Sequence, residues 1–250
     1  MMEAKITGGI VTYNNEKTIK ECVQSILDHT KGCQFQLYIY DNCSTDDTVR
    51  ILKNNFPEVI LIKGKKNIGF GQGHNQIIKR IKSDYHTIIN PDIFLNYDVI
   101  SYISKYMEEN PGVIQLTPEI RNMDGTVQYL PKVDPNIKFV ILSKLAPFKY
   151  YRKIYTMENV LMDKPTEIMS CTGCFSMIQT SVLKKIHGYD RRFFMYFEDA
   201  DLSRRLRVYG QLIYHPKIFV YHAWKRDNTH SLKGICIFLM SMIKYYKKWR

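Results

Sequence analysis

The class of fold follows from residues 6–62, which read ITGGIVTYNNEKTIKECVQSILDHTKGCQFQLYIYDNCSTDDTVRILKNNFPEVILI. Three short apolar runs, at 6–11, 35–40 and 59–62, have the length of buried strands, and the segments between them carry apolar residues at helical spacing. This alternation predicts an α/β fold whose mainly parallel central sheet is flanked by helices. Ligands of such sheets bind beyond the carboxyl ends of the strands, and Asp41 stands at one such end.

The rest of the chain continues this pattern with one break. Further strands are predicted at 86–89, 113–117, 168–178 (two short runs), 212–214 and 218–222, and further helices at 98–109, from 181 onward and at 232–250. The form of a capping box at 44–47 predicts the start of the helix that runs through Phe56. Residues 121–126 carry an Asp-Gly hairpin signal. Residues 131–165 have four prolines and no clear periodicity, so we expect a loop or insertion there, with basic residues at Lys144, Lys149, Arg152 and Lys153.

Length and charge limit the classes of function. A chain of 250 residues suffices for one large α/β domain or two small ones. The formal net charge of +12 indicates an anionic partner: nucleic acid, a phosphorylated ligand or an acidic membrane surface. The six cysteines are spaced too widely for a disulfide scaffold, and we expect mostly buried thiols in a reducing compartment. The pair Cys171 and Cys174 has the spacing of half a zinc site, but no second pair follows, so no metal is expected there. The N-terminus shows no signal-peptide pattern.

Two segments have the composition of ligand-binding loops. Residues 67–75, NIGFGQGHN, place three glycines ahead of a predicted helix, which would let the backbone approach a ligand and present the helix N-terminus to an anion. Asn90-Pro91-Asp92 ends a predicted strand, where a carboxylate after a rigid proline can bind a hard metal ion. Each segment alone is also compatible with an ordinary turn.

Residues 193–210, FFMYFEDADLSRRLRVYG, place three carboxylates in the first turn of a predicted helix. The helix N-terminus stabilises negative charge, so Asp201 could simply pair with Arg205 one turn later. The preceding aromatic run favours a second interpretation. Carboxylates beside an apolar wall are partly desolvated, which is how a protein makes a usable general base.

The last segment, 232–250, predicts a single helix. Its apolar run, from Ile235 to Ile243, is far shorter than the roughly 20 residues that a membrane span needs. It continues into KYYKKWR, and interleaved cations and aromatic residues on a short apolar helix fit the surface of an anionic bilayer. Docking of this helix on the domain, with a solvated basic end, is the alternative.

Taken together and in this order, the motifs at Asp41, 67–75, 90–92, Gly173 and 198–205 resemble glycosyltransferase family two, whose members are inverting, nucleotide-sugar-dependent enzymes with the Rossmann-like GT-A fold. The resemblance covers about residues 6–222 and is strongest to the rhamnosyltransferase branch, which builds bacterial surface polysaccharides from dTDP-L-rhamnose. It implies a single domain over 1–230, with a nucleotide-sugar-binding half at 1–118 and an acceptor-binding half at 119–230. The amphipathic helix at 231–250 follows.

The resemblance implies a donor-nucleotide site at Thr12, Tyr13, Asn14, Asp41, Asn67, Gly69, Phe70, Gly71, Asn75 and Asn90. Asp41 matches the carboxylate that accepts a hydrogen bond from the pyrimidine, and both uracil and thymine offer an N3–H donor. Asn90 stands where the family's Asp-x-Asp metal motif often has its first Asp, so Asp92 would be the main protein ligand of Mg²⁺ or Mn²⁺. His222 matches a histidine that is an additional metal ligand in some members.

For catalysis, the resemblance implies that Asp199, next to Glu198, is the base. It removes the proton of an acceptor hydroxyl, whose oxygen attacks C1 of the sugar from the face opposite the departing diphosphate, so one displacement inverts the anomeric centre. Gly173, Cys174, Phe197, Asp201 and Arg205 are assigned to the acceptor and sugar pocket.

The resulting hypothesis is transfer of L-rhamnose from dTDP-rhamnose to a hydroxyl of a glycan or lipid-linked glycan, in the cytoplasm at the inner face of the plasma membrane. Peripheral contact with an anionic membrane is expected, and a homodimer is left open. Three alternatives remain: a UDP-hexose donor, a binding module of the same fold without turnover, and a nucleic-acid-binding protein. No zinc-finger, homeodomain or RNA-binding signature supports the last of these, so no nucleic acid partner is expected.

Overall fold

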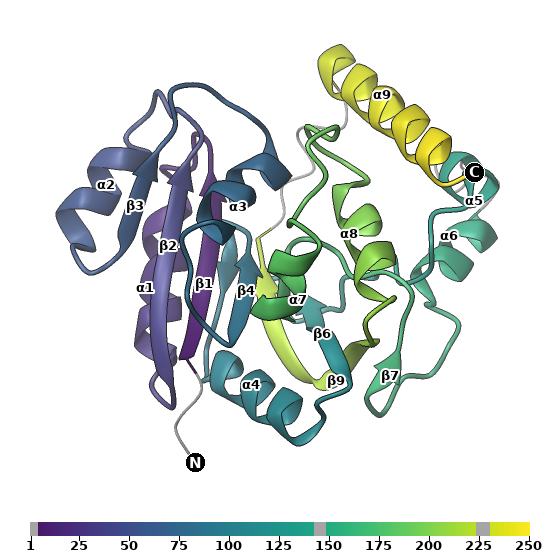
Figure 1. The fold of residues 1–250 in the computed structure, drawn as a ribbon, viewed down its shortest axis with the longest axis horizontal. Helices are drawn as coiled ribbons and strands as arrows, with labels where there is room; N and C mark the ends of the chain where they lie inside the picture. Colours follow the sequence, from purple (N-terminus) through teal and green to yellow (C-terminus); the bar gives the residue numbers. More distant parts are fainter. Residues whose placement is uncertain (1–4, 143–148, 224–230) are drawn as a thin grey trace.

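A computed structural model describes residues 5–142, 149–223 and 231–250 of the chain. The predicted basic residue Lys144 lies outside these ranges. One sheet, with strand order β3-β2-β1-β4-β8-β6-β9-β5 and with β7 paired to β9, runs through the molecule and carries helices on both faces (Figure 1). Most paired residues lie in parallel pairs, so the prediction of an α/β fold with a mainly parallel sheet is confirmed.

The first half of the sheet consists of alternating strands and helices, as predicted from the sequence. Its strands are all parallel, and its elements are β1 (Lys5–Thr12), α1 (Ile19–His29), β2 (Gln34–Asp41), α2 (Thr48–Asn55), β3 (Ile60–Lys63), α3 (Phe70–Ile78) and β4 (Tyr85–Ile89). Strand residues alternate between two cores because successive side chains of a strand point to opposite faces. Ile10 packs with α1, whereas Val11 packs with α3.

The second half mixes parallel and antiparallel pairs. Its elements are β5 (Ile93–Phe94), α4 (Val99–Glu109), β6 (Val113–Arg121), β7 (Thr166–Glu167), β8 (Phe175–Gln179), α7 (Thr180–Lys185), α8 (Glu198–Leu206) and β9 (Gln211–His222). β8 joins the halves, since it pairs antiparallel with both β4 and β6. The predicted boundary at residue 118 falls inside β6, and the division into a donor half and an acceptor half stays a prediction.

The two short strands predicted at 212–214 and 218–222 are one strand, β9. Pro216 suggested a break, because proline cannot donate to a sheet ladder. The strand continues through it by a shift in register: His215 pairs with Pro118, and the next pair is Phe219 with Glu119. Such a bulge leaves the proline without a ladder partner and lets the strand carry on to His222.

Residues 131–165, predicted as a loop or insertion, contain two short helices, α5 (Ile137–Leu142) and α6 (Lys149–Thr156). Neither shows a clear pattern of its own, because their packing partner lies about a hundred residues further along the chain. Val140 and Tyr155 join an apolar cluster with Tyr245 of α9 (Leu232–Lys248). Figure 1 shows α5 and α6 beside the C-terminal end of α9.

Two predicted helix starts shift in the structure. The expected capping box at 44–47 does not form. Instead, Asp46 accepts from the backbone N–H of Thr48 at 3.1 Å, and α2 begins at Thr48. The helix expected after the glycines begins inside them, at Phe70, with Gly69 as its N-cap at φ 87°. The hairpin predicted at 121–126 is present, closed by an antiparallel bridge from Arg121 to Val127. Within the described ranges, no helix combines the length and apolar character needed to cross a bilayer.

Candidate active site

The turn after β4 carries the predicted metal-binding carboxylate. The backbone N–H of Ile93 donates to the carbonyl of Asn90 at 3.2 Å and closes the turn. β5 then pairs with β9, which sets Ile93 opposite His222, and the N–H of Ala223 donates to the carbonyl of Asp92 at 2.9 Å. As a result, Oδ1 of Asp92 lies 3.2 Å from Nε2 of His222. The two predicted metal ligands, 130 residues apart in the chain, are neighbours.

Gln128 fixes the ring of His222. Its amide nitrogen donates to the carbonyl of His222 at 2.9 Å and to Oδ1 of Asn122 at 2.7 Å, which leaves the amide oxygen facing Nδ1 of His222 at 3.0 Å. An amide oxygen only accepts, so Nδ1 carries a hydrogen, and Nε2 is the ring nitrogen that faces Asp92. Gln128 was not predicted from the sequence, because its spacing from Asp92 and His222 matches no recognisable motif.

This pair fits a divalent cation. A carboxylate oxygen and an imidazole nitrogen, both common ligands of divalent cations, lie 3.2 Å apart, a separation at which both could bind one ion. Among the residues that the structure describes, no group of three or more His, Cys, Asp or Glu side chains could hold a metal ion. Mg²⁺ typically binds through one or two protein groups together with substrate phosphates. Asp92 and His222 would therefore hold the ion jointly with a ligand's phosphate oxygens.

The second predicted carboxylate, Asp199, lies in the first turn of α8 and is partly exposed. Oδ1 accepts from the N–H of Ala200 at 2.8 Å, and Oδ2 accepts from the N–H of Gly173 at 3.2 Å. Burial raises the pKa of Asp199, while these backbone hydrogen bonds oppose the rise. A carboxylate held by two N–H groups, with a raised pKa and access to solvent, can accept a proton.

Glu198 is buried beside Asp199, with 7% of its surface exposed. Burial, and then the charge of Asp199, raise the pKa of Glu198 to about 8. Glu198 therefore retains its proton at neutral pH, and burial raises the pKa of Asp199 as well. Carboxyl groups with raised pKa values in one cleft are typical of active sites.

Gly173 and Cys174 connect the two carboxylates. Asp199 accepts from the N–H of Gly173, and the carbonyl of the next residue, Cys174, accepts from the N–H of Asn90 at 2.8 Å. The charges of Asp92 and Asp199 both help burial to raise the pKa of the Cys174 thiol to about 12. The turn that carries Asp92 and the predicted base thus meet at one two-residue segment of the chain.

The glycine loop reaches the same place. A Cβ atom on Gly173 would lie 3.1 Å from the ring of Phe70 and 3.7 Å from Cβ of Asp199, so Phe70 is close to the predicted base. The loop's own glycines serve contacts within the protein. A Cβ on Gly69 would lie 2.2 Å from the carbonyl oxygen of Phe194, and one on Gly71 would lie 2.9 Å from Tyr189. The need for glycine here is explained by this packing without a ligand.

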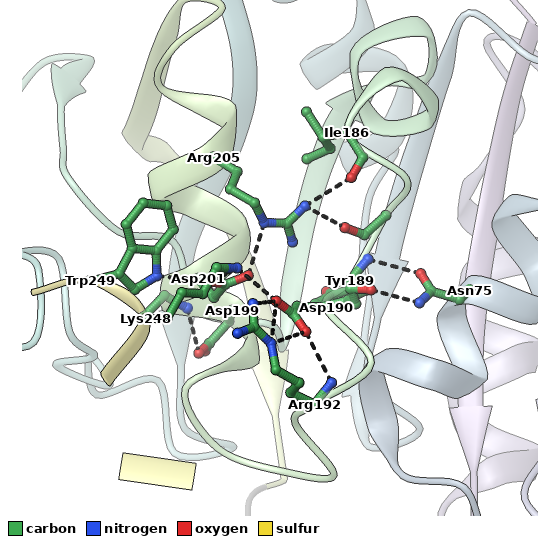
Figure 2. A network of polar contacts seen from close by, with 12 residues as sticks. Asn75, Ile186, Tyr189, Asp190, Arg192, Asp199, Asp201, Arg205, Lys248 and Trp249 are labelled. Carbon is green, nitrogen blue, oxygen red and sulfur yellow. Dashed lines mark hydrogen bonds and ion pairs between the residues drawn. The ribbon is translucent and has the colours of Figure 1, made fainter. Parts of the chain in front are cut away.

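Two asparagines hold this loop. Asn75 exchanges hydrogen bonds of 2.8 Å with the backbone N–H and C=O of Tyr189 (Figure 2). Asn67 accepts from the N–H of Gly69 at 3.0 Å. Buried Asn42, which the sequence did not single out, binds the N–H of Ile68 and the carbonyl of Gly69. These side chains order the loop, and their predicted contacts with a nucleotide stay predictions.

The predicted base-reading carboxylate, Asp41, ends β2 and is 2% exposed. Its two oxygens lie 3.2 and 3.3 Å from the N–H of Ser44. Thr12, at the end of β1, pairs with Asp41 across the sheet, as expected for neighbouring parallel strands. Asn14, at φ 55°, accepts from the N–H of Thr45, and Tyr13 beside it is 47% exposed. Four of the residues predicted to line the nucleotide site, Thr12, Tyr13, Asn14 and Asp41, therefore gather at the carboxyl ends of β1 and β2.

Asp201, predicted in the acceptor pocket, is fully buried and lies in a different environment (Figure 2). Its Oδ2 accepts from Nε of Arg205 at 2.9 Å, and its Oδ1 accepts from Nε1 of Trp249 at 2.9 Å and from Nζ of Lys248. Arg205 also donates to the carbonyls of Ile186 and Gly188. The described contacts of this pair are to protein, and they tie α8 to the end of α9.

The α8 helix begins from an unusual backbone. Tyr196 and Phe197 both have positive φ, 69° and 65°, a conformation that costs about 1–3 kcal/mol per residue and persists where the surroundings enforce it. Here α9 supplies the surroundings. The ring of Phe197 lies 5.4–5.5 Å from the rings of Phe238 and Tyr245. Phe197, predicted in the sugar pocket, thus also anchors the N-terminus of α8.

Known proteins with similar sequences include rhamnosyltransferases. L-rhamnosyltransferase acting on N-acetylglucosaminyl-diphospho-decaprenol from Mycobacterium tuberculosis is 27% identical over 85% of this chain and 74% of its own length. Rhamnosyltransferase WbbL from Escherichia coli K12 is 24% identical over 96% of this chain and 92% of its own. Both are similar along most of their length.

Among solved structures, the mannosyltransferase PcManGT from Pyrobaculum calidifontis, in complex with GDP-Man and Mn²⁺, matches with a TM-score of 0.68 at 13% identity. The match covers 99% of this chain and 65% of that one, so the chain spans about two thirds of the solved protein. At this identity the likeness concerns the fold, which is of the GT-A type. The sequence profile described as glycosyl transferase family 2 matches residues 9–187, more than half of the chain. The chain therefore belongs to glycosyl transferase family 2.

Proposed function

We propose that this chain transfers L-rhamnose from dTDP-L-rhamnose to a hydroxyl of a glycan or lipid-linked glycan, with inversion at the anomeric carbon. The observation that carries the proposal is the meeting of Asp92 and Asp199 at Gly173 and Cys174. Rhamnose is favoured over other sugars because two relatives that match most of the chain are rhamnosyltransferases. The reaction is proposed to take place in the cytoplasm at the inner face of the plasma membrane.

The residues divide the reaction between them. Asp41 accepts from N3–H of thymine, with Thr12, Tyr13 and Asn14 beside it at the strand ends. Asp92 and His222 would hold Mg²⁺ or Mn²⁺, which would supply positive charge for the departing diphosphate.

At the reacting centre, Asp199 takes the proton of the acceptor hydroxyl as that oxygen forms its bond to C1 and the bond from C1 to the diphosphate oxygen breaks. Glu198, with a pKa of about 8, keeps its own proton at neutral pH and does not compete with Asp199 for the proton of the acceptor. The backbone N–H groups of Gly173 and Ala200 orient the carboxylate for this transfer. The ring of Phe70, close to Gly173, helps to keep water from C1.

A thermal-shift panel tests the donor. The protein is heated with dTDP-rhamnose, UDP-glucose, UDP-galactose, UDP-GalNAc or GDP-mannose, each with and without Mn²⁺. A donor at about 100 times its dissociation constant adds about 2.7 kcal/mol, which raises Tm by about 5–10 °C for a chain of this size. We expect that rise with dTDP-rhamnose and Mn²⁺, and a smaller one in Asp92→Asn.

The panel separates the alternatives. A rise with one UDP-sugar only would replace the proposed donor by a hexose. A rise with dTDP-rhamnose but no metal-dependent release of dTDP, with or without glycan acceptors, would indicate a binding module. No rise with any nucleotide sugar would contradict the proposal as a whole.

A further inference from the structure

Helix α9 has one face packed on the protein. Tyr245 is buried, Oγ of Ser241 donates to the carbonyl of Met195 at 2.7 Å, and Nζ of Lys244 donates to the carbonyl of Arg192 at 2.9 Å. Lys248 adds the ion pairs with Asp190 and Asp201. These contacts fix α9 against the segment that leads into α8 and against α8 itself.

The opposite face of α9 is apolar and exposed. We call it the α9 strip, and its members are Leu232, Ile235, Cys236, Leu239, Met240 and Ile243. Their spacing of three and four residues places them on one side of the helix. Leu232 is 83% exposed, Met240 55% and Ile243 62%. Such a contiguous apolar surface is unusual on a soluble monomer and typically marks an interaction site.

The charges around the strip are of one sign. Lys233 lies at its N-terminal end, and Lys247 and Arg250 lie at its C-terminal end, all three exposed. From Leu232 to Arg250 the sequence contains no acidic residue. Two exposed basic residues of α6, Arg152 and Lys153, belong to the helix that Figure 1 shows near the C-terminal end of α9. An apolar strip between cations matches the surface of a bilayer with anionic headgroups.

We propose that the α9 strip docks the protein on an anionic lipid bilayer, with the helix lying in the plane of the membrane. The inference extends the proposed function, in which a lipid-linked acceptor is one of the two acceptor classes. From Leu232 to Ile243 the strip is about 17 Å long at 1.5 Å per residue, about half of a bilayer core, so it lies on the membrane and does not span it.

A second copy of the chain fits this face less well. Two α9 helices packed strip to strip would bring Lys233, Lys247 and Arg250 of each copy to one interface, where α9 offers no carboxylate to pair with them. Anionic headgroups supply the missing charge, at about 1 kcal/mol per basic residue near the surface. Charge complementarity therefore selects the bilayer.

Docking of α9 on a bilayer also positions the candidate active site, because the packed face of α9 contacts α8. Since α9 binds Asp201 and supports Phe197, the surface that meets the bilayer is joined rigidly to the helix that carries Asp199. A docked bilayer is thereby held at a fixed position relative to Asp199. An acceptor anchored in that bilayer would meet the site in a restricted range of orientations, which favours a lipid-linked acceptor over a free glycan.

Vesicle flotation tests the docking without any donor or acceptor. The full chain is mixed with vesicles of phosphatidylcholine alone or with 30% phosphatidylglycerol, at a fixed protein concentration. We expect at least tenfold stronger binding to the anionic vesicles. The double variant Leu239→Glu, Ile243→Glu is expected to lower that binding at least tenfold.

The matched control is Tyr102→Glu, Val208→Glu, which places the same charge change on two exposed apolar residues outside α9. It should bind vesicles as wild type does, and equal Tm values confirm that both variants fold. Equal binding by the two double variants would show attraction by net charge alone and overturn the proposal. So would a wild-type dimer in light scattering that the α9 variant breaks without any vesicle binding. Because the donor panel uses no vesicles and flotation uses no donor, failure of one is distinguishable from failure of the other.

Discussion

Asp199 and Asp201, two carboxylates in the first turn of α8, lie in different environments. Asp199, on the side of the Gly173 turn, is held by backbone N–H groups only, and burial raises its pKa. Asp201, on the side of α9, is surrounded by Arg205, Lys248 and Trp249. Two residues of the same type, two positions apart, are therefore prepared for different tasks: one retains proton affinity, and the other has its charge compensated by cations.

Residues that are close in sequence therefore need not belong to the same site. The motif that includes both acids predicts Asp199 as the base and Asp201 in the acceptor pocket, whereas Asp201 is buried among Arg205, Lys248 and Trp249. Substitution of Asp199 should therefore lower the transfer rate, whereas substitution of Asp201 should lower folding stability.

The largest effect is expected from Asp199→Asn. Removing a positioned general base typically costs about 10²–10⁴-fold in rate, and we expect kcat for sugar transfer to fall within that range. The free energy of unfolding should change by about 1 kcal/mol or less, since the amide avoids the cost of burying a charge but can accept from only one of the two backbone N–H groups. Initial rates of dTDP release with acceptor and urea unfolding measure the two quantities. Wild-type kcat in this variant would remove Asp199 as the base.

Asp201→Asn should do the opposite. It leaves Lys248 and Arg205 near a neutral group, and removal of one partner from a buried ion pair costs about 3 kcal/mol of unfolding free energy. Urea denaturation measures it. In the double variant with Lys248→Met, the two losses should be less than additive, because the contact between these side chains is lost once and not twice, while Lys248→Met alone also removes the ion pair with Asp190.

This pair of variants also tests the acceptor-pocket prediction for Asp201 and Arg205. A large fall in kcat in Asp201→Asn at unchanged unfolding free energy would support that prediction and contradict the structural role. A loss of stability with kcat within about tenfold of wild type would support the α8–α9 link.

A third carboxyl group in the first turn of α8, that of Glu198, should make the stability of the protein depend on pH. Glu198 binds its proton more tightly in the folded chain, with a pKa of about 8, than in the unfolded chain, near 4.3. The folded state therefore holds a proton that the unfolded state releases, and this contribution to stability declines as pH rises toward and through about 8. Between pH 7 and 9, unfolding free energy of wild type should fall by about 1 kcal/mol more than that of Glu198→Gln. Parallel urea curves at the two pH values measure the difference, and identical slopes with pH would contradict the assignment.

The sequence was sufficient where structure is set locally. The strands and helices of residues 5–89 follow from apolar periodicity, because each element buries one face against its sequence neighbours. β9 and the helices α5 and α6 were not foreseen, because a bulge opposite Pro118 and a cluster with Tyr245 depend on partners far along the chain.

The same distinction explains which residues of the candidate site were predicted from the sequence. Asp92 and Asp199 were identified from motif order, since each ends or begins an element recognisable by itself. Gln128 behind His222, and Lys248 and Trp249 beside Asp201, were missed. They act through contacts across 94, 47 and 48 residues, and single polar side chains at such separations leave no pattern in the sequence.

The smallest expected loss among the contacts of Asp201 concerns the end of α9. Trp249→Phe removes the hydrogen bond from Nε1 to Asp201 but keeps a ring near the guanidinium of Arg204, which lies 4.6 Å from the indole. Lys248 and Arg205 still compensate the carboxylate, so the loss in unfolding free energy should be about 1.5 kcal/mol, the lower end for a hydrogen bond to a charged group and about half of the loss in Asp201→Asn. If urea unfolding gave the two variants equal losses, the indole and not the cations would hold α9 to α8. The division of roles between the two sides of the turn would then rest on a single hydrogen bond from the indole, and the charges around Asp201 would need another explanation.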